Sequence, residues 1–287
     1  MKQPYHIPII LVALIMAVAI GCGKNGAGEE MPETEANKGG LIVTEEVVRP
    51  VCCGDFNWPL LSVTEERHIL KYDPDDKIVS KESYRIDRKW LKKFGPLYKS
   101  AEVQYIYNDD GNLAKIMQQI FDNKGVLISE YETQFKYDTE GKKTAMFRHE
   151  IDGNHYSLVM SSEMAYNDDG LLCREMMVIG IDTTYSTYTW KPDGTCLVSE
   201  TTGQERSSYL IDGESHNLLE IYAADGTVIE KLEYNGRDLI RETSGNRTSE
   251  YTYKRKYDKE GNCIRFSSYC DGRWMETIRR HIQEIED

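Results

Sequence analysis

The chain has 287 residues, and its 48 aspartates and glutamates outnumber its 35 lysines and arginines, giving a formal net charge of −13 at pH 7. A surface this acidic repels phosphate backbones and anionic lipid headgroups. The composition therefore argues against a nucleic-acid partner and against membrane attachment by charge.

An uncharged apolar run extends from Ile9 to Ile20. It is too short to cross a bilayer as a helix, which takes about 20 residues. Its length suits the core of a secretory signal peptide, with Lys2 as the basic start. An ordinary cleaved signal that ends near a cysteine and an uncleaved anchor helix are the other interpretations, and the run length disfavours the anchor. We predict a signal peptide over residues 1–21.

The residues Ala19-Ile20-Gly21-Cys22 that close this run resemble the lipobox of bacterial lipoproteins, although Ala19 stands where the family prefers Leu. In that family a signal peptidase cuts before the cysteine, and the thiol carries a lipid. The resemblance implies that Cys22 is the lipidated N-terminus of the mature chain and its membrane anchor. Gly23 replaces the Asp that retains enterobacterial lipoproteins at the inner membrane. The implied location is thus the cell envelope at the outer membrane, either periplasmic or surface-exposed.

Residues 22–40 follow as a flexible tether, because they are rich in Gly, Glu, Asn and Lys and offer little to bury. Residues 41–287 remain for a single all-β domain. Disulfides are permitted outside the cytoplasm, and the sequence leaves their pairing open. The cysteines beyond Cys22 are Cys52, Cys53, Cys173, Cys196, Cys263 and Cys270.

One short pattern recurs along residues 70–270. It consists of two aromatic or apolar residues separated by a spacer, then Asp- or Asn-type residues, Gly, any residue and an aliphatic residue. The copy Tyr105-Ile-Tyr107-Asn-Asp-Asp-Gly111-Asn-Leu113 is typical. Copies lie some tens of residues apart, which indicates an array of one supersecondary unit. Their key aromatics are Tyr72, Tyr107, Tyr137, Tyr166, Trp190, Tyr222 and Tyr257.

The pattern predicts a strand, a turn and a second strand. Residues 131, 133, 135 and 137 are Tyr, Thr, Phe and Tyr, whereas the alternate positions 130–136 are Glu, Glu, Gln and Lys, as in a half-buried strand. Asp and Asn start turns by bonding their own backbone, and Gly supplies the positive φ. A looser set of turns lies between the copies, such as Ile151-Asp152-Gly153.

We therefore predict an all-β fold, an antiparallel meander of repeated hairpins that forms one long, twisted sheet and curls toward a partly closed barrel. About a dozen strands are expected. The N-terminal strands and the charged segment 273–287 are expected to cover the two ends of the sheet, as terminal repeats do. Residues 87–94 allow one or two helical turns.

The Tyr-x-Tyr-Asp-x-x-Gly-x-Leu pattern resembles the YD repeats of bacterial Rhs-type proteins, and related hairpin repeats occur in lipoproteins of the Bacteroidetes. The resemblance implies a fold and says little about activity. The Arg that follows the Gly in YD repeats is missing here, and the array is too short for the closed shell of the large Rhs proteins. The residues at that position are Asn112, Lys142, Leu171, Thr195, Thr227 and Asn262.

The repeat also accounts for several cysteines. Cys196 and Cys263 stand two positions after the turn glycine, where other copies have Leu or Val, so we interpret them as small core hydrophobes. Cys263 and Cys270 are expected on one strand, about 23 Å apart and beyond the reach of a disulfide. Cys52 and Cys53 would point to opposite faces of a strand.

No motif predicts a metal site, a cofactor or a catalytic centre. His149 and His155 flank a turn and would face each other across a hairpin, but no third ligand accompanies them. The acidic turns 108–110 and 167–169 lack the first ligand of a calcium loop, because Ile106 and Ala165 stand there, and turn formation explains their acids.

The most suggestive feature for function is the 19 Tyr and 4 Trp residues of an acidic, tethered sheet. Aromatic rows stack on sugars or anchor protein partners, although packing is the first role of the repeat tyrosines. Trp58, Trp90 and Trp274 lie outside the repeat motif and are the candidate ligand-binding residues. We predict a non-catalytic binding or scaffolding surface for a protein or glycan. The alternatives are a secreted glycan hydrolase with a carboxylate pair and a purely structural envelope component.

Overall fold

The computed structural model describes residues 40–51, 61–86 and 96–285. Within these ranges the chain consists of strands and turns, and no helix there is long and apolar enough to cross a membrane. The strands are β1 (Leu41–Val51), β2 (Leu61–Tyr72), β3 (Ile78–Ile86), β4 (Leu97–Tyr107), β5 (Leu113–Phe121), β6 (Leu127–Tyr137), β7 (Lys143–Asp152), β8 (His155–Tyr166), β9 (Leu172–Ile179), β10 (Asp182–Trp190), β11 (Thr195–Thr202), β12 (Glu205–Asp212), β13 (Leu218–Tyr222), β14 (Val228–Asn235), β15 (Asp238–Ser244), β16 (Arg247–Tyr257), β17 (Cys263–Cys270) and β18 (Arg273–Glu284).

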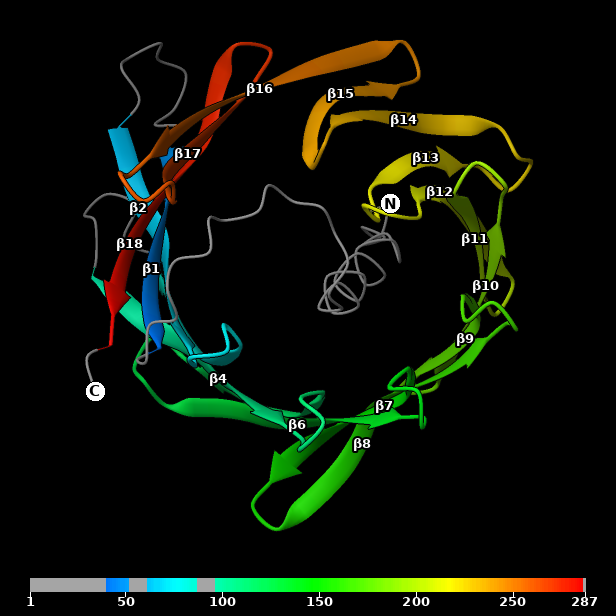
Figure 1. Cartoon of the computed structure of the whole chain (residues 1–287), viewed down its shortest axis with the longest axis horizontal. Coiled ribbons are helices and arrows are strands. Elements are labelled where there is room, and N and C mark those ends of the chain that lie inside the picture. Colours follow the sequence, from blue (N-terminus) through cyan, green and yellow to red (C-terminus); the bar gives the residue numbers. More distant parts are fainter. Residues whose placement is uncertain (1–39, 52–60, 87–95, 286–287) are drawn as a thin grey trace, which may run out of the picture.

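The strands form one 18-stranded antiparallel sheet, in which each strand pairs with the strands before and after it in the sequence. The last strand returns to the first, with Leu41 opposite Glu284 and Val48 opposite Thr277. Figure 1 shows the resulting ring of strands, viewed along the barrel. The predicted all-β meander that curls into a barrel is therefore confirmed, and closure is complete.

Two details of the prediction are wrong. The described chain has 18 strands rather than about a dozen, because tight hairpins also reverse the chain at places where no turn was predicted. Gly180 and Ile181 make such a hairpin between β9 and β10, where Ile179 pairs with Asp182. The terminal strands do not cover the ends of an open sheet but pair with each other. This pairing gives the backbone N–H and C=O groups of both edge strands hydrogen-bond partners, whereas an open sheet would leave two rows of these groups unpaired.

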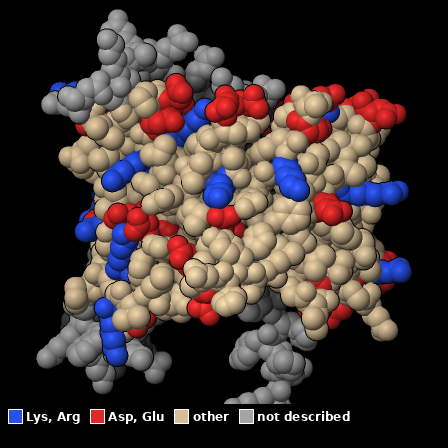
Figure 2. All heavy atoms as spheres, turned by 90° about the horizontal axis from the view of Figure 1, so that it is seen from below, with Lys and Arg blue, Asp and Glu red and all other residues tan. Residues whose placement is uncertain are grey.

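The predicted turns after β2, β4, β6, β8, β10 and β16 lie at one end of the barrel, which we call the upper rim. In the turn after β6, Asp138 Oδ1 accepts hydrogen bonds from the N–H groups of Glu140 and Lys142, both at 2.9 Å. Gly141 has a φ of 80°, which favours glycine. In the first copy Asp76 takes the glycine position with a φ of 57°. The turn prediction is confirmed, and Figure 2 shows acidic side chains gathered along the upper edge of the wall.

The repeat aromatics link neighbouring hairpins. Four of the seven donate a hydrogen bond to a backbone carbonyl near the start of the strand that follows the preceding upper-rim turn, and Tyr253, which stands four positions before Tyr257, makes a similar contact. Such a contact requires a ring long enough to reach across two strands. The bonds are Tyr107 to Ile78 (3.0 Å), Tyr137 to Leu113 (2.8 Å), Tyr166 to Lys143 (2.7 Å), Trp190 to Leu172 (2.8 Å) and Tyr253 to Leu239 (2.7 Å).

One copy of the repeat breaks this order. The turn after Tyr222 connects β13 to β14, so it lies at the opposite, lower rim. Its tyrosine hydroxyl donates to the Glu220 side chain (2.6 Å) instead of a backbone carbonyl. Three strands, β11 to β13, separate this turn from the one after β10, whereas two strands separate the earlier copies, so this copy is out of phase with them. β13 itself has only five residues and short ladders.

Candidate functional site on the barrel walls

The strand register separates an inner wall from an outer wall. Directly paired residues of antiparallel neighbours point to the same face. The face with Thr133 and Phe135 continues through Met146 to Ser162, and farther on to Val198. Side chains converge on the concave face of a barrel and diverge on the convex face. The largest fully buried side chains, Val198, Cys196 and Ser162, lie on this face, so it is the inner wall.

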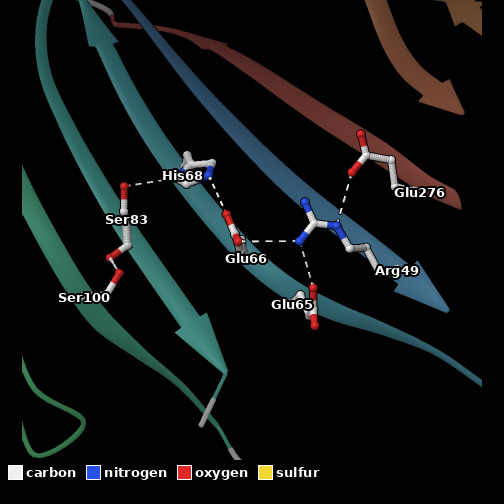
Figure 3. Close-up of polar contacts among 7 residues, drawn as sticks. All are labelled: Arg49, Glu65, Glu66, His68, Ser83, Ser100 and Glu276. Atoms are coloured by element: carbon white, nitrogen blue, oxygen red, sulfur yellow. Dashed lines mark hydrogen bonds and ion pairs between the residues drawn. The ribbon is translucent and has the colours of Figure 1, made fainter. Parts of the chain in front are cut away.

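A polar cluster on the inner wall joins the first two strands to the last. Figure 3 shows the Arg49 guanidinium between acids from both neighbouring strands. Arg49 Nη1 lies 2.9 Å from Glu65 Oε2 and 3.7 Å from Glu66 Oε1, and Arg49 Nε lies 3.2 Å from Glu276 Oε2. The acids come from β2 and β18 and the cation from β1. The cluster therefore adds side-chain ion pairs to the pairing of β1 with β18, which closes the barrel and which we call the seam.

His68 extends this cluster toward β3 and β4. Its Nδ1 lies 3.0 Å from Ser83 Oγ and its Nε2 lies 3.4 Å from Glu66 Oε2, while the Ser100 hydroxyl donates to the Ser83 carbonyl at 3.0 Å. Burial, with a smaller contribution from Lys81, lowers the pKa of His68, so the imidazole is neutral at pH 7.

The order Ser83, His68, Glu66 matches the residue types of a nucleophile, a base and an orienting acid. Glu66 also lies 3.7 Å from the Arg49 guanidinium, so its carboxylate is shared between the imidazole and this cation. The arrangement is therefore a hydrogen-bonded link across β2, β3 and β4. Sequence reasoning missed it because its members lie on separate strands without a fixed spacing.

A second polar row crosses β8 to β12 on the inner wall. Glu175 accepts hydrogen bonds from Ser162 (2.5 Å) and Tyr188 (3.0 Å), and Glu200 accepts one from Tyr209 (3.0 Å). Burial raises the pKa of Glu200, and the nearby Glu175 adds to this effect. Glu200 is only 6% exposed, so this carboxylate is largely shielded from solvent.

The outer wall carries ion pairs between neighbouring strands. Lys115 Nζ lies 3.0 Å from Glu132 Oε2, and Lys99 Nζ lies 2.6 Å from Glu102 Oε2. Between β1 and β2 on the same wall, Arg67 Nη2 lies 2.6 Å from Glu46 Oε1. Figure 2 shows basic and acidic side chains across the middle of the wall as well as at its edge.

Of the candidate ligand-binding residues, Trp58 and Trp90 lie outside the described residues, as does the predicted lipidation site Cys22. Trp274 stands on the outer face of β18, opposite Tyr269. Its Nε1 donates to Thr277 Oγ1 at 3.0 Å, which ties the indole to its own strand. The binding role of the three tryptophans stays a prediction.

The described cysteines, Cys173, Cys196, Cys263 and Cys270, are free. Cys196 is fully buried, and burial raises the pKa of its thiol to about 11, so its interpretation as a core residue is confirmed. Cys263 and Cys270 share β17, as predicted. Cys52 and Cys53 lie outside the described residues, as does the segment 87–94.

The expected approach of His149 and His155 is wrong. His149 pairs with Leu158 on the outer wall, whereas His155 pairs with Asp152, which lies on the other face. His149 packs edge-on against Tyr156, and its buried Nδ1 has no hydrogen-bond partner. In the described part of the chain, no three His, Cys, Asp or Glu side chains are grouped so that they could hold a metal ion.

Comparison with known proteins gives no family assignment. No family model and no curated protein matches the chain. Among solved structures, a porin-like protein from Bacteroides uniformis is similar with a TM-score of 0.39 and 11% identity, over 84% of this chain and 97% of that one. The Tc holotoxin pore of Photorhabdus luminescens is similar with a TM-score of 0.16 and 8% identity, over 73% of this chain and 19% of that one. At these TM-scores neither similarity identifies a function.

Proposed function

We propose that this protein is a lipid-anchored component of the cell envelope, and that its barrel is a non-catalytic scaffold standing outside the bilayer. The lipobox-like segment ending at Cys22 supports the anchor. The inner wall supports the non-catalytic role, because Arg49, Glu175 and Glu200 are each engaged in contacts between strands.

The observation that carries the proposal is the charge on the outer wall. A barrel that spans a membrane presents an outward apolar band about 25 Å tall, and a Lys or Arg facing lipid at the midplane costs about 2–4 kcal/mol. Here Lys99, Lys115 and Arg67 form ion pairs on the convex face. Such a charged wall is more stable in water than in lipid, so the acyl chains on Cys22 would attach the protein to the membrane. Two or more acyl chains are enough for a long-lived attachment.

A cleavable tether tests this proposal. A protease site placed between residues 23 and 40 of the full chain is cut on isolated membranes, which are then washed with alkaline carbonate. We expect the barrel to leave the membrane without detergent. If the barrel remains with the membrane after the cut and the wash, it is inserted and the proposal is wrong.

Lipid labelling tests the anchor separately. Cys22→Ser should abolish incorporation of labelled palmitate, whereas Cys173→Ser, a matched control within β9, should retain it. Labelling of the Cys22→Ser chain would show that another residue carries the lipid.

A further inference from the structure

The inner wall from β4 to β8, one side of the ring in Figure 1, carries little charge. On these strands, between the level of Glu150 and the upper rim, the inward charged residues are Glu150, Arg148 and Lys143, all on β7. The outer wall of the same sector carries ion pairs, so the two walls reverse the arrangement of a membrane-spanning barrel. The apolar inward residues include Val103, Ile116, Ile120, Phe135, Met146 and Met160.

A sheet of 18 strands encloses more space than its inward side chains fill. About eight strands are just wide enough for side chains to fill a barrel, whereas about 16 to 18 strands leave a lumen. Ile116, Phe135 and Met160 accordingly stay half-buried on the inner wall, and Ile179, which pairs with Met160, is 42% exposed. An apolar molecule that enters the lumen would remove these side chains from water.

Arg148 is a cation set in this apolar lining. Its Cζ lies 4.3 Å from the centroid of the Tyr131 ring, and its Nη2 donates to Gln118 Oε1 at 2.8 Å. The direct cross-strand neighbours of Arg148 are Thr133 and Met160. The contacts from β5 and β6 fix the plane of the guanidinium, and its other N–H donors remain for a ligand.

Within the described residues, no carboxylate neutralises Arg148. Glu150, two positions along β7, forms no ion pair with it, and neither residue has a further contact. Burial lowers the pKa of Arg148, and Tyr131 rather than an acid opposes this effect. By contrast, Arg49 and Arg67 each contact an acid. A half-buried cation without a counter-charge attracts an anionic group.

Lys143 is the other cation of this wall, and an acid offsets its charge. Its Nζ lies 5.3 Å from the centroid of the Phe135 ring. Burial lowers the pKa of Lys143, and Glu175 on β9 opposes this effect. Glu175 also accepts hydrogen bonds from two hydroxyl groups. Arg148 is therefore the cation of this sector that is left for a ligand.

The lining favours an amphiphile over a glycan or the chain's own tether. A glycan needs many hydrogen-bonding groups, but the Tyr137 hydroxyl already donates to a carbonyl and Arg148 covers the Tyr131 ring. Residues 22–39 contain carboxylates, but Met31 is their only long apolar side chain. A carboxylate accepts two parallel hydrogen bonds from an arginine, and an acyl chain needs none.

We propose that the lumen binds an amphiphile of the fatty-acid class, with its carboxylate at Arg148 and its acyl chain along the inner wall of β4 to β8. The site joins an apolar surface to one convergent charged group, which is the usual composition of a small-molecule site. This inference goes beyond the proposed scaffold function and does not depend on the anchor at Cys22.

Photo-labelling tests the inference on the full chain. Isolated membranes that hold the protein are incubated with palmitate carrying a diazirine in its acyl chain and irradiated, and the labelled residues are mapped by mass spectrometry. We expect labels on inward residues of β4 to β8, and excess palmitate should remove them. Hexadecanol has the same chain length without the charge, so it should compete about tenfold or more weakly.

A matched pair of variants provides the second arm. Arg148→Met removes the charge and keeps an unbranched side chain, so it should lower the labelling that palmitate competes for by about tenfold or more. Arg174→Met, on the outer wall of β9, should label like the wild type. Urea unfolding curves show whether both variants fold. The hexadecanol competition needs no variant and decides the question if Arg148→Met does not fold.

Several results would overturn the inference. These are no label that palmitate competes for, equal competition by hexadecanol and palmitate, or undiminished labelling of a folded Arg148→Met chain. Labelling that appears only after deletion of residues 24–38 would assign Arg148 to the tether instead. If cleavage of the tether releases the barrel while the label is missing, only the ligand inference fails and the proposed function stands.

Discussion

At the scale of single residues, the repeat aromatics have a role that the sequence pattern indicates only in part. Alternation along residues 130–137 correctly predicted which side chains share a face with Tyr137. The pattern did not reveal that the hydroxyl reaches the Leu113 carbonyl, because this contact depends on the register between hairpins. The same limit applies to His68 and Ser83, which meet only after β2 and β3 pair.

Removing one of these hydroxyls tests its role. Tyr137→Phe deletes the 2.8 Å hydrogen bond to the part-buried Leu113 carbonyl, so we expect the free energy of unfolding to fall by about 0.5–1.5 kcal/mol in urea titrations. Tyr185→Phe is the control, because that ring is largely exposed on the outer wall. Equal unfolding midpoints for the two variants would contradict the role assigned to Tyr137.

At the scale of strands, β13 is the irregular element. It has five residues, and its ladder to β14 consists of the pairs Glu220–Lys231, Ile221–Glu230 and Tyr222–Val228. The sequence motif around Tyr222 looks like the other copies, and motif matching alone could not predict that its turn lies at the lower rim. The rim is set by the number of strand reversals before it, which includes the weakly marked hairpins.

Hydrogen exchange tests the consequence of this short pairing. Backbone N–H groups of β13 should exchange about tenfold or more faster than those of β7, because fewer ladder bonds must break for local opening. β7 is the internal reference, since it has long ladders to β6 and β8. Protection in β13 equal to that in β7 would show that the barrel has no weak sector there.

At the scale of the whole molecule, closure through β1 and β18 is the decisive feature. It removes both sheet edges, which are the surfaces through which open β-sheets aggregate. The Arg49 cluster adds ion pairs from β1 to both of its neighbours, so the seam is held by side chains as well as by the ladder.

Removing β18 tests closure. A chain that ends before Arg273 would expose the edges of β17 and β1, so we expect it to self-associate with rising concentration in light-scattering measurements. A chain that ends at Glu284 keeps β18 and should behave like the full protein. If the shorter chain stays monomeric with an unchanged unfolding midpoint, the seam does not stabilise the fold.

The sequence by itself determined the local structure of this protein. Alternating aromatics and Asp–Gly turns set strands and reversals, because both depend on residues within a few positions of each other. Tertiary structure alone decided that the sheet closes and which wall faces inward. These features require strands far apart in the chain to pair in one register, and in the sequence β1 and β18 carry no local mark of their pairing.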